Sequence, residues 1–252
     1  MKFESLNKKS FSFKGGPVGC ILLHGFTSNP EEMQKLGEYL AEKGVSIRIP
    51  LLPGHGTVPS DLAQIKWTDW TGLVRDEYFN LRKTCQEIFV CGQSMGGTLA
   101  LHLGSHHPVN GIISIAAPVK YERKELRYIP LLKRFMKYYP KKHGNDIGDP
   151  ELKERHQSYP VYPLPAILEF QTLIRHTFDD LPEITAPTLV VHSESDHTIS
   201  HMTAEIILRR IQSAEKVKLM FQKSYHLITL DFDREQLYQR IFEFIKRHSQ
   251  NL

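Results

Sequence analysis

The chain has 252 residues, of which 40% are hydrophobic and 24% charged, and it carries a formal net charge of +4 with histidine neutral. This length and composition suit one α/β domain, residues 1–252, with a large core, and they exclude an intrinsically disordered chain. The basic residues are scattered apart from a group within residues 120–142, so we expect no nucleic-acid partner, because nucleic acid needs a denser positive patch.

The first half of the chain alternates the patterns of strands and helices. Residues 18–24 are a continuous apolar run, which is typical of a strand buried on both faces. Asn29, Pro30 and two acidic residues then mark the start of a helix, and Gly44 marks its end. The further elements expected here are a candidate antiparallel edge strand at residues 10–13, strands at residues 45–50, 87–91 and 111–116, and helices at residues 67–85 and 95–106.

Residues 118–185 break this alternation. They are rich in tyrosine, proline and basic residues, and they contain two helix-like stretches near residues 126–139 and 165–180. An insertion between two strands at the edge of a sheet where ligands bind is typical of a lid. We interpret it as a small helical cap, residues 118–185, inserted after the sixth strand.

The alternation resumes after the insertion. Strands are expected at residues 188–192 and 217–221, and helices at residues 200–211 and 233–248. Asp233 and Gln236 have the spacing of a capping box at the start of the last helix. Strands that alternate with helices predict an α/β fold with a doubly wound, mostly parallel sheet and helices on both faces.

Three cysteines, Cys20, Cys85 and Cys91, are too few for a disulfide framework. Cys20 and Cys91 fall within expected core strands, where a free thiol behaves as a small apolar side chain, and this suits a reducing compartment. The first residues lack the apolar segment of a signal peptide, and no run of about 18 apolar residues occurs. We therefore expect a cytoplasmic protein with no stable membrane insertion.

The most informative motif is Gly92-Gln93-Ser94-Met95-Gly96, at the junction of an expected buried strand and a helix. A serine between two glycines at such a junction is the sequence form of a nucleophile elbow, a turn with little room for a Cβ two residues before and after the serine. Ser94 is therefore a candidate nucleophile. The motif is common by chance, so the prediction also depends on an acid and a base further along the chain.

A serine hydroxyl needs a base to accept its proton and a carboxylate to orient that base, and in this fold the acid precedes the histidine. Asp196, a few residues after the strand at 188–192, is the preferred acid. Glu194 competes with it, and an alternative role for Asp196 is to cap the helix that follows. His226 lies in the short loop between the last strand and the last helix, and it is the preferred base.

Other histidines form two groups. His192 and His201 belong to a pattern around Asp196 that spans a strand end, a loop and a helix start, with His197 between them. This pattern lacks cysteine and a second carboxylate cluster, so we predict no metal. The second group comprises His102, His106 and His107, at the end of an expected helix. Protonated imidazoles there would meet the negative end of the helix dipole, so we interpret this group as structural.

The tetrahedral intermediate of acyl transfer needs two preorganised N–H donors. The backbone N–H of Met95, at a helix N-terminus and directly after the candidate nucleophile, is the first. The N–H of Phe26, in the loop after the first buried strand, is the second, and Gly25 lets the chain turn back over the site. His24 and His55 are interpreted as residues that support this loop.

Together these motifs resemble the α/β-hydrolase superfamily, and more closely its branch of bacterial carboxylesterases and monoacylglycerol lipases. The motifs that carry the resemblance are Leu22-Leu23-His24-Gly25-Phe26-Thr27, Leu52-Pro53-Gly54-His55-Gly56, Trp67-Thr68-Asp69-Trp70, Gly92-Gln93-Ser94-Met95-Gly96-Gly97, His192-Ser193-Glu194-Ser195-Asp196-His197 and Ser224-Tyr225-His226. The resemblance implies an α/β-hydrolase fold and a carboxylic-ester hydrolase with a small cap over an apolar acyl pocket. The candidate lining residues, which equally suit packing of the cap on the core, are Ile129, Leu131, Leu132, Phe135, Ile167, Phe170 and Ile174.

We therefore expect a serine carboxylesterase that hydrolyses esters of short to medium acyl chains through an acyl-enzyme intermediate. A monoacylglycerol lipase, a thioesterase and a carbon–carbon bond hydrolase use the same nucleophile, acid, base and oxyanion donors, so they remain alternatives. A non-catalytic small-molecule receptor on a hydrolase fold is the alternative from a different class. We expect a small-molecule ester as the partner, no cofactor, and a monomer or weak homodimer.

Overall fold

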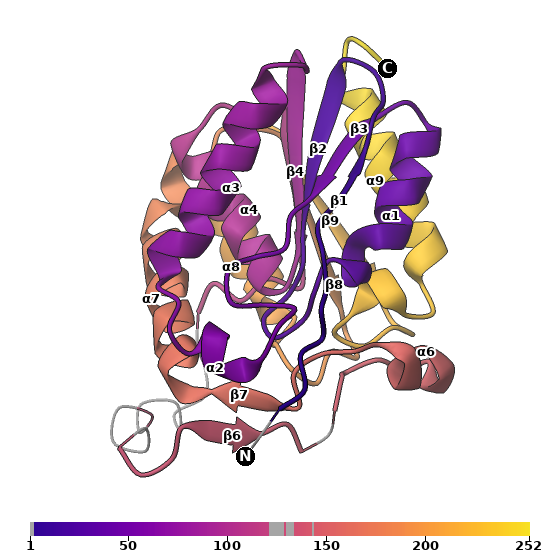
Figure 1. The fold of residues 1–252 in the computed structure, drawn as a ribbon. Coiled ribbons are helices and arrows are strands. Elements are labelled where there is room, and N and C mark those ends of the chain that lie inside the picture. Colours follow the sequence, from indigo (N-terminus) through magenta and orange to yellow (C-terminus); the bar gives the residue numbers. More distant parts are fainter. Residues whose placement is uncertain (1–2, 121–128, 130–133, 143) are drawn as a thin grey trace.

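A mostly parallel β-sheet forms the centre of the molecule (Figure 1). The computed structural model describes residues 3–120, 129, 134–142 and 144–252, and within them this sheet has seven strands in the order β1-β3-β2-β4-β5-β8-β9. β1 (Phe11–Phe13) is antiparallel to β3, and the other neighbouring pairs are parallel. The other strands are β2 (Val18–Leu23), β3 (Ser46–Ile49), β4 (Glu87–Gln93), β5 (Gly111–Ile115), β8 (Thr188–Ser193) and β9 (Lys216–Phe221). The predicted α/β-hydrolase fold is confirmed.

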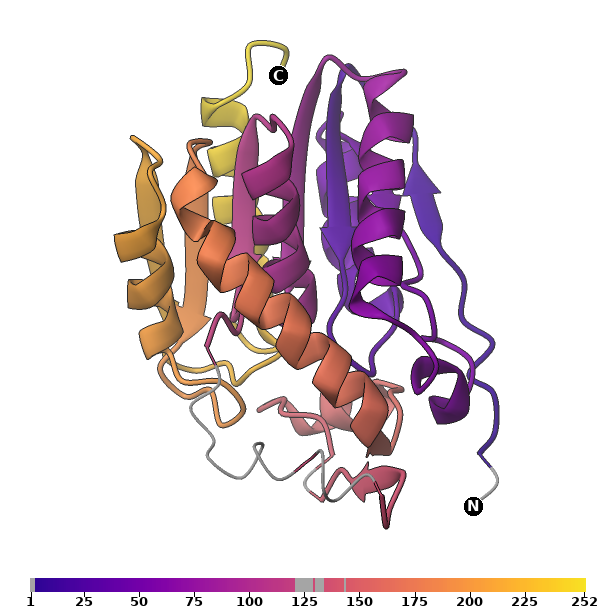
Figure 2. The ribbon, with the colours of Figure 1, turned by 90° about the vertical axis from the view of Figure 1, so that its left-hand side faces the viewer.

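Helices cover both faces of the sheet (Figures 1 and 2). One face carries α1 (Glu31–Glu42) and α9 (Arg234–Arg247), and the other carries α3 (Trp67–Arg82), α4 (Met95–His106), α7 (Leu164–Asp180) and α8 (Met202–Arg210). Side chains alternate along β4, so Ile88 and Val90 join the apolar core on the α3 side, while Phe89 and Cys91 join the core on the α1 side. Because both faces are covered, the central strands are continuously apolar.

Local capping chemistry marks both ends of α1 but not the start of α9. Asn29 Oδ1 accepts the N–H of Glu31 at 3.0 Å where α1 begins, and Gly44 follows the helix with a φ of +89°. The predicted capping box at the start of α9 is wrong. The carboxylate of Asp233 instead accepts the N–H and the hydroxyl of Ser224, each at 2.8 Å, because this tertiary contact holds the loop after β9.

The chain leaves the sheet between β5 and β8. This insertion contains a two-stranded antiparallel ribbon of β6 (Tyr138–Pro140) and β7 (Val161–Pro163), the helix α6 (Pro150–Arg155), and α7. Figures 1 and 2 show the ribbon and α6 beyond the carboxyl ends of the parallel strands. The predicted place of the insertion, after the sixth strand, is wrong by one. Among the described residues, five strands, β1 to β5, precede it.

The helix expected near residues 126–139 is wrong at its end, because Tyr138 and Tyr139 belong to β6, where they pair with β7. Residues 126–128 and 130–133 of that stretch lie outside the described residues. The short elements are α2 (Pro59–Leu62) and the 3₁₀ helices η2 (Leu181–Glu183) and η3 (Ile228–Leu230). In the described part of the chain, no helix combines the length and apolarity needed to cross a membrane. All three cysteines are buried as free thiols.

Candidate active site

Ser94 sits at the sharp turn between β4 and α4. Its backbone has φ 55° and ψ −118°, a conformation that is strained for a residue with a side chain. A Cβ on Gly92 would lie 2.1 Å from the carbonyl carbon of Gly96, and a Cβ on Gly96 would lie 2.1 Å from the carbonyl oxygen of Leu23. Both positions therefore need glycine, and the turn lifts the Ser94 hydroxyl off the end of β4.

Three side chains from separate loops meet at the carboxyl ends of the strands. Nε2 of His226 lies 2.9 Å from Oγ of Ser94, and Nδ1 of His226 lies 2.7 Å from Oδ2 of Asp196. Ser94 follows β4, Asp196 follows β8 and His226 follows β9. The structure thus joins the candidate nucleophile, acid and base by hydrogen bonds, although Ser94 and His226 are 132 positions apart in the chain.

Asp196, rather than Glu194, contacts the histidine. The Asp196 side chain is 0% exposed, and its Oδ1 accepts the N–H groups of Thr198 and Ile199, each at 2.8 Å. Glu194 is exposed and hydrogen-bonds a glutamine side chain on the surface. Asp196 therefore takes the role of the acid and does not cap α8, because one oxygen bonds His226 and the other holds the turn at residues 198–199, before the helix begins.

The charges of this pair stabilise each other. Burial lowers the pKa of His226, but the adjacent Asp196 carboxylate and its hydrogen bond outweigh burial, so the pKa lies above its ordinary value. Burial raises the pKa of Asp196, and the nearby His226 more than reverses this effect, so that pKa lies below its ordinary value. The arrangement therefore favours an imidazolium beside a carboxylate, which is the state that forms when His226 accepts a proton.

The loop after β2 lies against Ser94. A Cβ on Gly25 would lie 3.4 Å from the Cβ of Ser94, so the loop backbone approaches the serine closely. Phe26 follows in this loop, and Met95 is the first residue of α4. Neither N–H group of these two residues donates to another residue in the described part of the chain, which leaves both available to a bound oxygen atom.

Glu32 is a residue of this site that the sequence analysis does not identify. It lies in the first turn of α1, and its Oε1 accepts the N–H of Gly25 at 2.9 Å. Burial is the main cause that raises the pKa of Glu32 to about 7. The signal that could have revealed it is its position one turn before Leu36, on the buried face of α1. Both acidic residues lie in the first turn of α1, as the sequence suggested, and only Glu32 is buried.

Two neutral histidines support the same loop. Nε2 of His24 accepts the N–H of Leu52 at 3.2 Å, and the ring of His55 contacts the ring of His24 edge to face, with centroids 5.0 Å apart. Burial lowers the pKa of His55 to about 4 and, with the nearby His55, lowers that of His24 well below its ordinary value. These rings are therefore uncharged, which agrees with a supporting role rather than proton transfer.

A cavity of about 530 Å³ opens beside Ser94. One wall is apolar: Phe26 stacks on Phe170 of α7 with ring centroids 5.3 Å apart and on Tyr162 of β7 at 6.3 Å, and Ile167 adjoins them. Residues from the insertion therefore form part of the cavity wall. Ile167 and Phe170 are the two expected pocket residues that line it in the described part of the chain.

The other expected pocket residues are placed differently. Ile129 and Ile174 are buried but do not line the cavity. Ile174 packs into the core, because α7 continues past the cavity. The prediction for Phe135 is wrong, since this residue is 79% exposed. Leu131 and Leu132 lie outside the described residues.

A polar wall of the cavity carries a cation, Lys141, and it adjoins the apolar wall, because Nζ of Lys141 lies 5.6 Å from the centroid of the Tyr162 ring. Nζ of Lys141 donates to Asn145 Oδ1 at 2.9 Å and to Ser158 Oγ at 3.0 Å, and Nε2 of His156 lies 3.1 Å from Ser28 Oγ. Burial lowers the pKa of Lys141 to about 8 and that of His156 to about 4. The sequence analysis did not identify this wall, because its residues come from three loops with no shared motif.

The remaining histidines take separate places. Nδ1 of His192 accepts the N–H of Ser193 at 3.0 Å and lies 3.7 Å from Asp196 Oδ2. Nδ1 of His197 instead lies 3.0 Å from Asp146 Oδ1, so these two histidines face different carboxylates. The interpretation of His102 as a cation at the end of α4 is wrong, because burial lowers its pKa to about 4.

Comparisons with known proteins show the family of this chain. The model of a family described as serine aminopeptidase, S33, matches residues 18–233. The chain is 36% identical over 246 residues to a thermostable monoacylglycerol lipase of Bacillus sp. (strain H-257), covering 95% of this chain and 94% of that protein. It is 33% identical to a carboxylesterase of Bacillus subtilis (strain 168), covering 95% and 96%. A solved structure of a metagenome-derived lipolytic enzyme superposes with a TM-score of 0.92 and 31% identity, covering 98% and 100%.

Proposed function

The chain belongs to the serine aminopeptidase S33 family of α/β-hydrolases, as an ester hydrolase of the carboxylesterase and monoacylglycerol lipase kind, and we propose that it is a serine carboxylesterase with Ser94 as nucleophile. The observation that carries this proposal is the hydrogen-bonded chain from Ser94 through His226 to Asp196. A serine hydroxyl is a weak nucleophile until a neighbouring base removes its proton, and His226 is in position to do so.

In the first half-reaction, Ser94 Oγ attacks the carbonyl carbon of the ester while His226 Nε2 takes the hydroxyl proton. The carbonyl oxygen becomes an oxyanion, and the N–H groups of Phe26 and Met95 stabilise it, each contributing roughly 3 kcal/mol. Asp196 stabilises the imidazolium. His226 then returns the proton to the leaving alcohol as the carbon–oxygen bond breaks, and the acyl group remains on Ser94.

In the second half-reaction, a water molecule attacks the acyl carbon while His226 Nε2 takes one of its protons. The same two N–H groups stabilise the second oxyanion. The bond between the acyl carbon and Ser94 Oγ then breaks, His226 returns the proton to Oγ, and the carboxylic acid leaves. Every proton in both halves moves through one nitrogen, so the charge state of His226 controls the whole cycle.

The cavity supports an ester with a short to medium acyl chain. We assign the acyl chain to the apolar wall of Phe26, Ile167 and Phe170, which offers carbon and ring surface beside Ser94. Because α7 and the β6–β7 ribbon supply part of the wall, residues 118–185 act as a cap that excludes water from the reacting atoms.

A monoacylglycerol lipase is the second candidate, and the polar wall favours it. Lys141, Asn145 and His156 line the same cavity as the apolar residues, so one substrate with an apolar chain and a hydroxyl-rich alcohol would match both walls. A simple alkyl ester would offer no hydroxyl group to this polar wall. The two candidates share the acyl site and differ in the alcohol.

The test of the nucleophile compares the protein with its Ser94→Ala variant on p-nitrophenyl esters of graded chain length. Loss of turnover in a folded variant, together with one fluorophosphonate adduct on Ser94, supports the proposal. Retained turnover by the variant would contradict it. No labelling together with tight binding of an ester would instead indicate a small-molecule receptor.

The test of the alcohol uses pairs of substrates with the same acyl chain, one a methyl ester and one a monoacylglycerol. A higher kcat/KM for the monoacylglycerol identifies the second candidate. Equal values identify a carboxylesterase without preference for the glycerol group. A parallel series of thioesters separates a thioesterase from both.

A further inference from the structure

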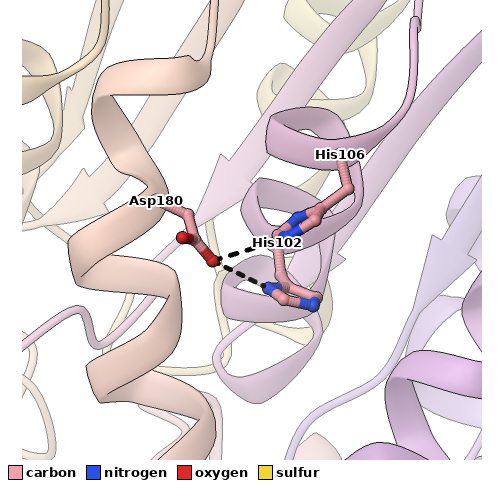
Figure 3. Close-up of side chains that lie close together, drawn as sticks. All are labelled: His102, His106 and Asp180. Atoms are coloured by element: carbon pink, nitrogen blue, oxygen red, sulfur yellow. Dashed lines mark hydrogen bonds and ion pairs between the residues drawn. The ribbon is translucent and has the colours of Figure 1, made fainter.

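A second cluster of chemically competent side chains lies between α4 and α7, away from the cavity. His102 and His106 are one turn apart on α4, and Asp180 is the last residue of α7. Figure 3 shows the carboxylate of Asp180 facing the two imidazole rings across the space between the helices. None of the three lines the cavity beside Ser94, and the proposed mechanism uses none of them.

One carboxylate oxygen faces both rings at equal distance. Oδ2 of Asp180 lies 3.7 Å from Nδ1 of His102 and 3.7 Å from Nε2 of His106. The three ligand atoms all lie within 4.8 Å of one another. Nitrogen and oxygen ligands that bind one zinc ion at about 2.0–2.2 Å in a tetrahedron are roughly 3.3–3.5 Å apart. The cluster therefore reaches a chelating geometry by side-chain adjustment, without movement of either helix.

The hydrogen bonds of the rings leave lone pairs directed at this point. Nδ1 of His106 lies 2.9 Å from the carbonyl oxygen of His102 and 2.9 Å from Oγ of Ser105. The carbonyl oxygen can only accept, and the Ser105 hydroxyl already donates to that carbonyl, so Nδ1 carries the hydrogen. In this tautomer, Nε2 of His106 is the ring nitrogen that faces Asp180 and can bind a metal ion. Nδ1 of His102 is buried without a hydrogen-bond partner among the described residues. A backbone carbonyl that fixes one ring nitrogen is the usual support of a metal-binding histidine.

We propose that His102, His106 and Asp180 bind one Zn²⁺ ion. Two imidazole nitrogens and one carboxylate oxygen are a zinc donor set, whereas Ca²⁺ and Mg²⁺ prefer oxygen ligands alone. Histidines four positions apart on a helix point to the same side and can share one metal. The side chain of His106 is 48% exposed, so an ion can enter from solvent, and water completes the fourth position.

A bound ion would connect two helices that support the cavity. α7 carries Ile167 and Phe170 of the apolar wall near its start and Asp180 at its end, while α4 begins at Met95 and carries the two histidines in its second half. The ion would therefore hold α7 against α4 without touching the reacting atoms. Its main effect is on the stability of the fold.

The first experiment titrates chelator-treated, metal-free protein with Zn²⁺ in a calorimeter. We expect one Zn²⁺ per chain and, with Zn²⁺ at about 100 times its Kd, a rise in Tm on the order of 5 °C. Co²⁺ in place of Zn²⁺ should give the visible absorption of a tetrahedral ion, and Ca²⁺ should leave the Tm unchanged. A metal-free protein that takes up no Zn²⁺ would overturn the proposal.

The second experiment assigns the site with three variants. His106→Gln and Asp180→Asn should each weaken Zn²⁺ binding at least about tenfold and remove the Co²⁺ absorption, because a ligand is lost. His107→Gln, the same change at the next position on the chain, is the matched control and should bind as the wild type does. Wild-type affinity in both ligand variants, or an equal loss in His107→Gln, would contradict the assignment. These outcomes do not depend on the proposed esterase activity.

Discussion

The N–H of Gly25 donates to Oε1 of Glu32 across 2.9 Å, and this hydrogen bond ties the loop after β2 to the first turn of α1. Phe26, a proposed oxyanion donor, is the next residue in that loop. The carboxylate is buried, so its charge state, the stability of the fold and the position of the loop are linked.

Glu32→Gln should reduce the loss of stability between pH 5 and pH 8. Burial raises the pKa of Glu32 from an ordinary 4.5 to about 7, so the folded state binds more protons than the unfolded state between these values. The free energy of unfolding of the wild type therefore falls as the pH rises from 4.5 through 7, by up to about 3 kcal/mol. Urea unfolding at pH 5 and at pH 8 measures this difference. The free energy of unfolding of Glu32→Gln should fall less between the two pH values than that of the wild type.

The same change at the adjacent Glu31, which does not contact Gly25, controls for the loss of one negative charge. An identical pH dependence in the wild type and in Glu32→Gln would sink this account of Glu32.

The rate of ester hydrolysis should fall as His226 becomes protonated. The Asp196 carboxylate holds the pKa of His226 above its ordinary 6.5, so kcat/KM should decline on the acid side with an apparent pKa above that value. Asp196→Asn should lower kcat by about 10³–10⁴-fold and move the decline to lower pH, because the variant loses the charge that stabilises the imidazolium. A pH–rate profile measures both effects.

Glu194→Gln is the matched control for this prediction, because Glu194 lies on the same loop but is exposed. It should change neither kcat nor the pH profile. If it instead reproduced the effects of Asp196→Asn, the acid would have to be reassigned.

Gly96→Ala should destabilise the fold by about 3 kcal/mol or more. The added Cβ would lie 2.1 Å from the carbonyl oxygen of Leu23, and backbone atoms of a central strand cannot move aside at low cost. Gly72→Ala, at a helical position with no atom within 4 Å of the added Cβ, should be stabilising by roughly 0.5–1 kcal/mol. Denaturant unfolding of both variants gives the comparison, and similar effects from the two would contradict the packing argument.

Lys141→Met should raise KM for a monoacylglycerol about tenfold, while KM for a methyl ester of the same acyl chain stays close to that of the wild type. The reason is that a hydrogen bond from a charged group contributes about 1.5–3 kcal/mol and the methyl ester has no hydroxyl to use it. Initial-rate kinetics on the two substrates provide the measurement.

Ser158→Ala separates binding from loop support, since Ser158 accepts from Lys141 but does not line the cavity. A selective effect of Lys141→Met that Ser158→Ala does not share indicates contact with the alcohol. The same shift in both variants would mean that Lys141 acts only by ordering the loop.

Sequence patterns were sufficient for the elements of the sheet and for the places of the candidate nucleophile, acid and base. Residues 18–23 read as a buried strand because both faces of β2 are covered, and burial on both faces leaves a continuous apolar run. Gly92 and Gly96 mark the turn around Ser94 because a Cβ would meet backbone at either position. These signals are local, so they are visible without a three-dimensional structure.

Other features depend on contacts that no local pattern encodes. The spacing of Asp233 and Gln236 predicts a capping box, but the carboxylate of Asp233 bonds Ser224 instead. Phe135 has the apolar character of a pocket residue, yet it is exposed. Each outcome depends on which segment folds against the residue, and that segment lies elsewhere in the chain.

By itself, the sequence determined the alternation of strands and helices, the tight turn at Ser94 and the order of nucleophile, acid and base, because these follow from side-chain period, glycine and chain position. Only the tertiary structure decided that Asp196 and not Glu194 contacts His226, that Glu32 is buried beneath the loop of Gly25, and that His102 and His106 face Asp180. Burial and the convergence of distant side chains arise when the chain folds, so they leave no signature in neighbouring residues.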